Sequence, residues 1–147
     1  MSNTIERAPV RALKPYARNA RTHSPRQIAQ IAASIERFGF TNPVLVDDDF
    51  NIIAGHGRVA AAKQLSIDSV PIVRLSHLSE AEKRAYVLAD NKLAENAGWD
   101  REILAIELQG LIDLDFAIEL TGFETAEIDL VLSEAADADV SASDAED

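Results

Sequence analysis

The chain of 147 residues is 47% hydrophobic and only 5% aromatic, which is enough apolar material for one domain with an aliphatic core. It has no cysteine, so disulfides, thiol nucleophiles and cysteine-bound zinc are excluded. The sequence shows no signal peptide and no apolar run of about 18 residues, so a cytoplasmic protein without a membrane contact is expected.

The net charge of −11 is distributed unevenly. Residues 1–75 contain 10 Lys and Arg against 6 Asp and Glu, whereas residues 76–147 contain 4 against 19. A polyanion such as DNA is therefore attracted by the first half of the chain and repelled by the second. A simpler interpretation is that the acidic half only confers solubility.

The first residues, 1–8, are expected to be frayed, and the alternation in Pro9–Leu13 predicts the first strand. The following segment, Tyr16–His23, has neither a helical nor a strand period. Loops of this kind often supply ligand contacts, although a solvated basic connection is the alternative. The residues in it that are candidates for contacts with phosphate or another polyanion are Arg18, Arg21 and His23.

A helix is predicted from Pro25, because Ser24 and Gln27 stand at the positions of a capping box and proline suits the first helical turn. Apolar residues recur with a helical period up to Gly39, which is expected to end the helix. The apolar segment Val44–Val46 predicts a strand.

The acidic segment Asp47–Asp49 connects this strand to the next, which ends at Ile52 and Ile53. Because the ligand spacing of a calcium loop is absent, a hairpin turn is predicted here. Ser69–Leu75 predicts a further strand, and Pro71 places it at a sheet edge or at a strand start.

The rest of the chain reads as helices. Ser79 and Glu82 form a second capping box, which opens a helix to about Asn96 with an apolar stripe at Ala85, Leu88, Ala89 and Leu93. Asp100 caps a helix to about Leu111, and a last helix is predicted near 125–133. The small, acidic residues 135–147 are expected to be disordered.

These elements predict an α+β fold, in which a small mixed sheet with flanking helices is followed by an all-helical part. The expected organisation is a sheet domain over residues 9–97, a helical extension over 98–134 and the acidic tail.

The stretch Asn51–Ser66 contains a Gly55-His56-Gly57 turn between a strand end and an alanine-rich helix that is expected to begin at about Arg58. Glycines allow a close backbone approach, and the N–H groups at a helix N-terminus attract anions. Arg58 adds a fork of donors suited to phosphate. The alternative is an ordinary strand-to-helix connection with a solvated arginine.

Two other features could complete a nucleotide site. Asp90 and Asn91 offer hard oxygen ligands for a magnesium ion that also holds nucleotide phosphates, and Lys92 adds a positive charge. The turn at Asn42 and Pro43 could provide hydrogen bonds to a base. A solvated helix face is the alternative for the first feature.

Evidence for a hydrolase or metalloenzyme is weak, since the sequence contains none of the motifs Gly-x-Ser-x-Gly, His-Glu-x-x-His or the eight-residue phosphate loop. His56 could act as an acid or base beside a bound anion, or it could only position the turn.

Three stretches in this order resemble the ParB/sulfiredoxin superfamily: Ser34–Val46 with GFTNPVLV, Ile52–Leu65 with IIAGHGRVAAAKQL, and Ala89–Asn96 with ADNKLAEN. They are similar to the N-terminal domain of ParB partition proteins and to ParB-like nuclease domains of phages and plasmids. The resemblance covers about residues 11–96.

In that family, the segment resembling 39–46 contacts a cytosine nucleotide, and the loop resembling 55–58 holds its triphosphate. A pair resembling Asp90-Asn91 helps to bind magnesium and is tied to hydrolysis. The resemblance therefore implies CTP or ATP with Mg²⁺ as the cofactors, and Gly55, Arg58 and Asn91 match the family pattern. His56 and Gly57 depart from it, because they replace a glutamate and the first of two arginines.

The form Gly-His-Gly-Arg also resembles the signatures of sulfiredoxin and of free-serine kinases. Sulfiredoxin activity is excluded, because it needs a cysteine. Modules of this type resemble those beside phage-type DNA methyltransferases, so such an enzyme, DNA bound through the basic half, and a second copy in a homodimer are expected partners. The acidic C-terminal helices are expected to read no DNA.

Three functions remain. The first is a nucleotide-binding accessory or switch in DNA modification or segregation. The second is an enzyme, such as a metal-dependent nuclease, nucleoside triphosphatase or small-molecule kinase, in which Asp90 and His56 are catalytic. The third is a protein-interaction module with a vestigial nucleotide site, whose acidic half binds a basic partner.

Overall fold

The computed structural model describes residues 4–15 and 22–145, with side chains up to residue 138. The chain divides into two compact units, residues 1–96 and 97–147. Arg18 and Arg21 lie outside the described residues. Within the described part of the chain, no helix combines the length and the apolar character needed to cross a membrane.

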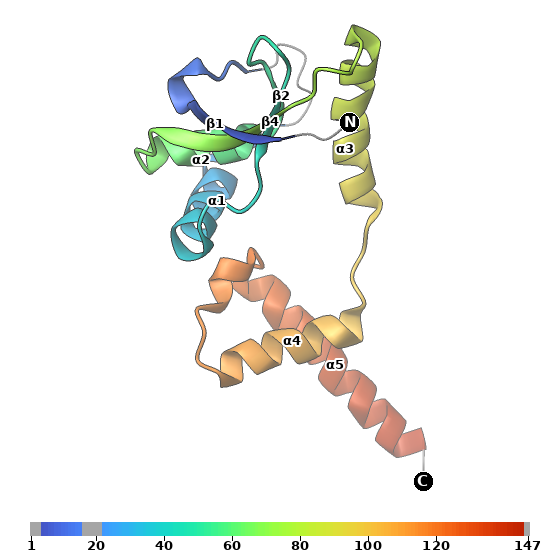
Figure 1. The fold of residues 1–147 in the computed structure, drawn as a ribbon. Helices are drawn as coiled ribbons and strands as arrows, with labels where there is room; N and C mark the ends of the chain where they lie inside the picture. Colours follow the sequence, from blue (N-terminus) through green and yellow to red (C-terminus); the bar gives the residue numbers. More distant parts are fainter. Residues whose placement is uncertain (1–3, 16–21, 146–147) are drawn as a thin grey trace. The chain divides into compact units, whose positions relative to one another are not determined.

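Four short strands of the first unit form one mixed sheet in the order β1-β4-β2-β3 (Figure 1). The strands are β1 (Ile5–Pro9), β2 (Val44–Val46), β3 (Ile52–Ala54) and β4 (Ser69–Arg74). β4 pairs antiparallel with β1 and parallel with β2, and β2 pairs antiparallel with β3. The predicted α+β class, with its mixed sheet, is therefore confirmed.

The first strand lies earlier than predicted, over Ile5–Pro9, and Val10–Ala12 form a 3₁₀ turn, η1. Strand β1 is fixed by pairing with β4, where the Arg7 Nη2 donates to the backbone oxygen of Ser69 at 2.8 Å. Val10 and Leu13 are both buried, and a spacing of three suits a 3₁₀ turn better than a strand. Sequence alternation alone therefore misplaced this strand.

Pro71 lies in an interior strand, so its expected position at a sheet edge or strand start is wrong. The physical reason for that expectation still holds, because proline cannot donate to a sheet ladder. Pairing between β2 and β4 begins only at Val44 and Ile72, one residue after Pro71. The missing N–H therefore falls outside the paired stretch of β2.

The helices of this unit are α1 (Pro25–Phe38), α2 (His56–Gln64) and α3 (Glu80–Asn96). Both predicted capping boxes are present. Ser24 Oγ accepts from the N–H of Gln27 at 3.1 Å, and Ser79 Oγ accepts from the N–H of Glu82 at 3.2 Å. In each box the Glu or Gln side chain accepts from the backbone N–H of the serine.

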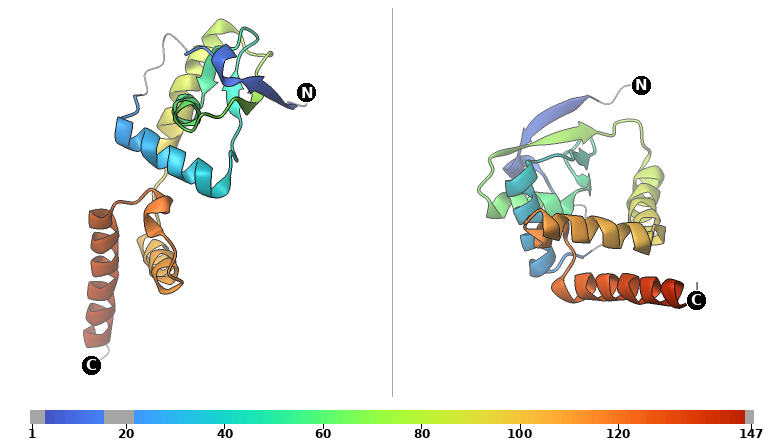
Figure 2. Two further views of the ribbon diagram at one scale, coloured as in Figure 1. Left: turned by 90° about the vertical axis from the view of Figure 1, so that its left-hand side faces the viewer. Right: turned by 90° about the horizontal axis from the view of Figure 1, so that it is seen from below.

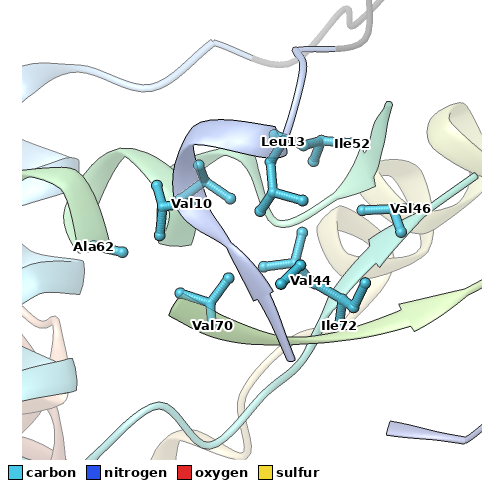
Figure 3. Packing of buried hydrophobic residues seen from close by; sticks show 10 residues of the cluster. Val10, Leu13, Val44, Val46, Ile52, Ala62, Val70 and Ile72 are labelled. Carbon is cyan, nitrogen blue, oxygen red and sulfur yellow. The ribbon is translucent and has the colours of Figure 1, made fainter. Parts of the chain in front are cut away.

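The sheet buries both faces, because neighbouring residues of β3 and β4 point in opposite directions. Ile52 and Ile72 pack with α2 in one cluster, whereas Ile53 and Val73 pack with α3 in another. Figure 3 shows the first cluster, in which side chains from η1, β2, β3, β4 and α2 converge. Helices α1 and α2 pack against each other, and α3 packs on β3.

The apolar stripe predicted for α3 is wrong. Leu88 and Leu93 are 60% and 68% exposed, and Val87 is the buried residue of this helix. Lys83 lies four residues before Val87 on the same face, and it pairs with a buried aspartate of the β2–β3 turn. This pairing rotates the helix away from the leucine stripe.

The second unit contains α4 (Arg101–Asp113), a 3₁₀ turn η2 (Ile118–Thr121) and α5 (Thr125–Ala145). Asp100 caps α4 as predicted, since its Oδ1 accepts from the N–H of Ile103 at 3.1 Å. Helices α4 and α5 lie side by side (Figure 2) and bury Leu104, Ala105, Leu108, Ile128 and Val131 between them. The backbone of α5 continues through the segment expected to be disordered, where alanines favour a helix.

Candidate functional site

The turn between β3 and α2 adopts a conformation that requires glycine at position 55. Gly55 has a φ of +107°, and a Cβ there would lie 3.0 Å from Nη2 of Arg58 and 3.4 Å from Cα of Val44. Gly55 is the N-cap, so α2 begins at His56, two residues earlier than expected. Glycine has no side chain with which to cap the helix. The N–H groups of a first helical turn have no acceptor within their own helix, and such helix starts are common anion-binding sites.

Arg58 folds back over this turn. Its Nη2 donates to the backbone oxygen of Pro43 at 3.1 Å, which ties the turn before β2 to the start of α2. Its Nε is buried and has no hydrogen-bond partner among the described residues. Burial lowers the pKa of Arg58, while the nearby negative charge of Asp90 acts in the opposite direction. A buried donor that lacks an acceptor is costly, so an anion bound here would stabilise it.

Gly57 leaves room for the side chains of His23, which precedes α1, and Ile31, which lies within α1. A Cβ at this position would lie 2.8 Å from Cδ1 of Ile31 and 3.2 Å from Cε1 of His23. The larger residue that the family pattern places here would displace both side chains. His23 thus occupies the space beside the turn that an arginine would otherwise need.

His56 and His23 influence each other across this turn. Burial lowers the pKa of His56, and the charge of His23 lowers it further. Two imidazoles near a helix N-terminus both favour a bound anion, because a negative ligand relieves their mutual repulsion. The predicted contact residue His23 is therefore brought to the turn.

The remaining candidates, Asp90, Asn91 and Lys92, lie on helix α3 and differ in their surroundings. The negative charge of Asp90 acts to raise the pKa of Arg58, so this residue is electrostatically coupled to the turn. The side-chain amide of Asn91 donates to the backbone oxygen of Val87 at 2.7 Å. Lys92 is 70% exposed, and its ammonium pairs with Glu95 at 3.5 Å. The structure thus associates Asp90 with Arg58 and gives Lys92 a partner on its own helix.

The described residues contain no group of three or more His, Asp or Glu side chains that could hold a metal ion. Asp90 and Asn91 are adjacent on a helix, so their side chains diverge by about 100°. One of them at a time can face a given ion. A magnesium ion here would need most of its ligands from phosphate oxygens and water, as is common for Mg²⁺ bound with a nucleotide.

The sequence analysis missed Asp47, which is the buried charged residue of the β2–β3 turn. Its Oδ1 accepts from the N–H groups of Asp49 and Asn51 at 3.0 and 2.9 Å, and Oδ2 accepts from the Asn51 amide at 3.0 Å. Oδ2 also pairs with Lys83 at 3.3 Å. An aspartate that accepts from the N–H two residues later is a known turn signal. The turn hydrogen bonds of Asp47 could therefore be predicted from the sequence, whereas its ion pair with Lys83 could not.

The predicted site residues therefore fall into four groups. Those at the turn are Pro43, Gly55, His56, Gly57, Arg58 and His23. Asn42 is exposed beside Pro43, and Asp90 and Asn91 lie on α3. Arg18 and Arg21 are outside the described residues.

A glycine turn that opens a helix is a common phosphate-binding element, and here it lies beside Arg58, whose buried Nε has no partner among the described residues. The chain belongs to the ParB N-terminal domain family, whose model matches residues 1–92. This confirms the resemblance noted in the sequence.

Curated relatives agree with this assignment. The chain is 57% identical over 76 residues to the ParB-like nuclease domain-containing protein YnaK of Escherichia coli K12, covering 52% of this chain and 87% of YnaK. It is 30% identical over 97 residues to the stage 0 sporulation protein J of Bacillus subtilis, covering 63% of this chain. The chain spans only about a third, 34%, of the length of that second relative.

A solved structure shares the fold. It is the C-terminally truncated chromosome-partitioning protein ParB of Caulobacter crescentus complexed with CTP-γ-S, with a TM-score of 0.70. The match covers 85% of this chain and 74% of that one, at 20% identity. At this identity, the likeness shows the fold alone.

The second unit also matches a family. Residues 102–147 match the ParB-methyltransferase HTH domain, a helix-turn-helix, where the sequence analysis expected only a helical extension that reads no DNA. A helix-turn-helix assignment favours DNA binding, whereas the acidic charge of these residues opposes it.

Proposed function

We infer that the first unit binds a nucleoside triphosphate of the CTP or ATP type, with its phosphates on the Gly55–Arg58 turn. The observation that carries this inference is the buried Nε of Arg58, which has no partner among the described residues and lies at the start of α2. A phosphate oxygen would supply the missing acceptor, and the helix N-terminus would supply further N–H donors. The CTP-γ-S bound by the structural relative from Caulobacter crescentus supports a cytidine nucleotide.

The surrounding residues have distinct roles in this proposal. His56 and His23 face the phosphates, and His23 takes the place of the arginine that Gly57 replaces. Asp90 holds the magnesium ion that accompanies the phosphates. Asn42 and Pro43 contact the base. The bound state acts as an accessory or switch in DNA modification or segregation, in keeping with the methyltransferase-associated family of the second unit.

The test is calorimetric titration of CTP, ATP and GTP with magnesium into the wild type and two variants. Arg58→Lys keeps the positive charge but loses the fixed fork, so binding should weaken at least about tenfold. Arg37→Lys is the matched control, because Arg37 lies in the last turn of α1, at the end of that helix away from its start at His23 and Pro25. Equal affinities in all three proteins, or no binding of any nucleotide to the wild type, would refute the site.

A further inference from the structure

The second unit contains one basic residue, Arg101, with which to contact a phosphate backbone. Residues 102–147 contain 14 Asp and Glu and no Lys, Arg or His. The last basic residue, Arg101, is committed to Glu134, whose Oε2 lies 2.8 Å from Nη2 and 2.9 Å from Nε. Binding of DNA by a helix-turn-helix depends on Lys and Arg contacts to phosphates, so this unit lacks the means for it.

The same two helices form an apolar groove of about 540 Å³. Ala105 and Val131 are 4% and 3% exposed and form its floor, together with the half-buried Ala135. Ile106 is 64% exposed and forms a wall. Arg101, Glu102 and Glu134 also line it, and Arg101 pairs with Glu134, so one net negative charge remains among the residues that line the apolar groove.

The negative charge of the second unit indicates which kind of ligand fits the groove. A second copy of this surface would bring its own acidic residues against these, which is unfavourable. Small alanine side chains in the floor allow a helix to approach closely, and an exposed isoleucine gains from burial. The occupant must therefore be helical and apolar on one face, with Lys or Arg beside that face.

We propose that the groove between α4 and α5 binds a basic amphipathic helix of a partner protein. The helix-turn-helix of this chain is then a protein-docking module, and it does not read DNA. This inference does not depend on the nucleotide site, because all the residues that carry it belong to the second unit.

The test uses the full chain and a fluorescently labelled Leu/Lys peptide of about 14 residues, which forms an amphipathic helix. Fluorescence anisotropy measures its affinity at low and high salt. Ile106→Ser should weaken binding about tenfold, because it removes the groove wall. Ile103→Ser is the matched control, since Ile103 lies on the same helix, is 57% exposed and does not line the groove.

A second pair of variants tests the charge. Glu102→Gln lies at the groove and should weaken the affinity about threefold, whereas Glu107→Gln, on the same helix but outside the groove, should leave it unchanged. Circular dichroism of each variant checks that the helices remain folded.

Three outcomes would overturn the proposal. Unchanged affinity in both isoleucine variants would mean that the peptide is attracted by charge alone, and equal weakening by both would place its contact outside the groove. Binding of a labelled DNA duplex to the chain, in the absence of peptide, that Ile106→Ser weakens and Ile103→Ser does not would restore the DNA-reading role. Concentration-dependent dimerisation that Ile106→Ser abolishes, measured by analytical ultracentrifugation, would make a second copy of the chain the occupant.

Discussion

The ammonium of Lys83 on α3 lies 3.3 Å from the carboxylate of Asp47 in the turn between β2 and β3. Both side chains are largely buried, at 17% and 7% exposure. The pair joins the helix that carries Asp90 to the hairpin that leads into the Gly55 turn. It therefore sets the rotation of α3 and, with it, the position of Asp90 relative to Arg58.

Removing this ion pair should destabilise the protein. Lys83→Met keeps the aliphatic stem but leaves Asp47 without its cation, and we expect a loss of about 2 kcal/mol in the free energy of unfolding. Lys92→Met is the control on the same helix. Its ammonium and the Glu95 carboxylate are 70% and 60% exposed, so a change below about 0.5 kcal/mol is expected. Urea unfolding followed by far-ultraviolet circular dichroism measures both, and equal losses would contradict the assignment.

The acid stability of the protein should depend on Asp47. Burial alone would raise its pKa, but the hydrogen bonds from Asn51 and Asp49 and the contact with Lys83 outweigh burial, so the pKa is lowered from the usual value of 3.8. Because its pKa is lower in the folded protein, the charged Asp47 stabilises the fold fully above about pH 3.8. This stabilisation is lost as the pH falls through the folded-state pKa. The stability difference between wild type and Asp47→Asn should therefore shrink below that pH. A constant difference between acid and neutral pH would show that the charge of Asp47 is not responsible.

A double-mutant cycle can test whether Ile31 restricts the size of the side chain at position 57. Gly57→Ala gains helix propensity but brings a Cβ within 2.8 Å of Cδ1 of Ile31, so a net loss of about 1 kcal/mol is expected. Ile31→Val removes that atom. In the double variant the alanine should therefore cost less, since only the contacts of its Cβ with the His23 ring at 3.2 and 3.3 Å remain, and the coupling energy should exceed about 0.5 kcal/mol. Additive effects in urea unfolding would place the crowding elsewhere.

Nucleotide binding should take up protons if the proposed site is correct. The pKa of His56 is lowered by burial and by His23 in the free protein, and bound phosphates would raise it. Binding then adds protons to His56, so affinity should increase as pH falls from about 7.5 to 6. Calorimetry in two buffers with different ionisation enthalpies measures this uptake.

The control for this experiment is His56→Gln, because the terminal phosphate of the nucleotide also titrates in this range. The variant should take up fewer protons on binding than the wild type does. Identical uptake in both proteins would show that His56 does not face the phosphates.

Local signals in the sequence predicted much of the fold. Ser24 and Gln27 define the start of α1, and the Gly55 turn defines the start of α2, because each depends on backbone geometry within a few residues. The predictions that were wrong concerned residues whose partners are far away in sequence. The stripe at Leu88 and Leu93 could not be rejected without knowing that Lys83 would meet Asp47, thirty-six residues away in sequence.

The candidate site shows the same division. The Gly55–Arg58 turn was readable, because its glycines and arginine are contiguous in sequence. The packing of His23 and Ile31 against Gly57 was not, since it joins the start of α1 to the start of α2. The structure was therefore needed to explain why position 57 departs from the family pattern.

The protein contains a single tryptophan, Trp99, whose ring packs against Phe123 with centroids 5.2 Å apart. Because both residues belong to the second unit, the tryptophan emission of this protein, excited selectively over that of its tyrosines, reports on that unit alone. Emission and far-ultraviolet ellipticity recorded along one denaturation curve would show whether the two units melt together or one after the other. Trp99 thus allows the cooperativity of unfolding between the two units to be measured without a fluorescent label.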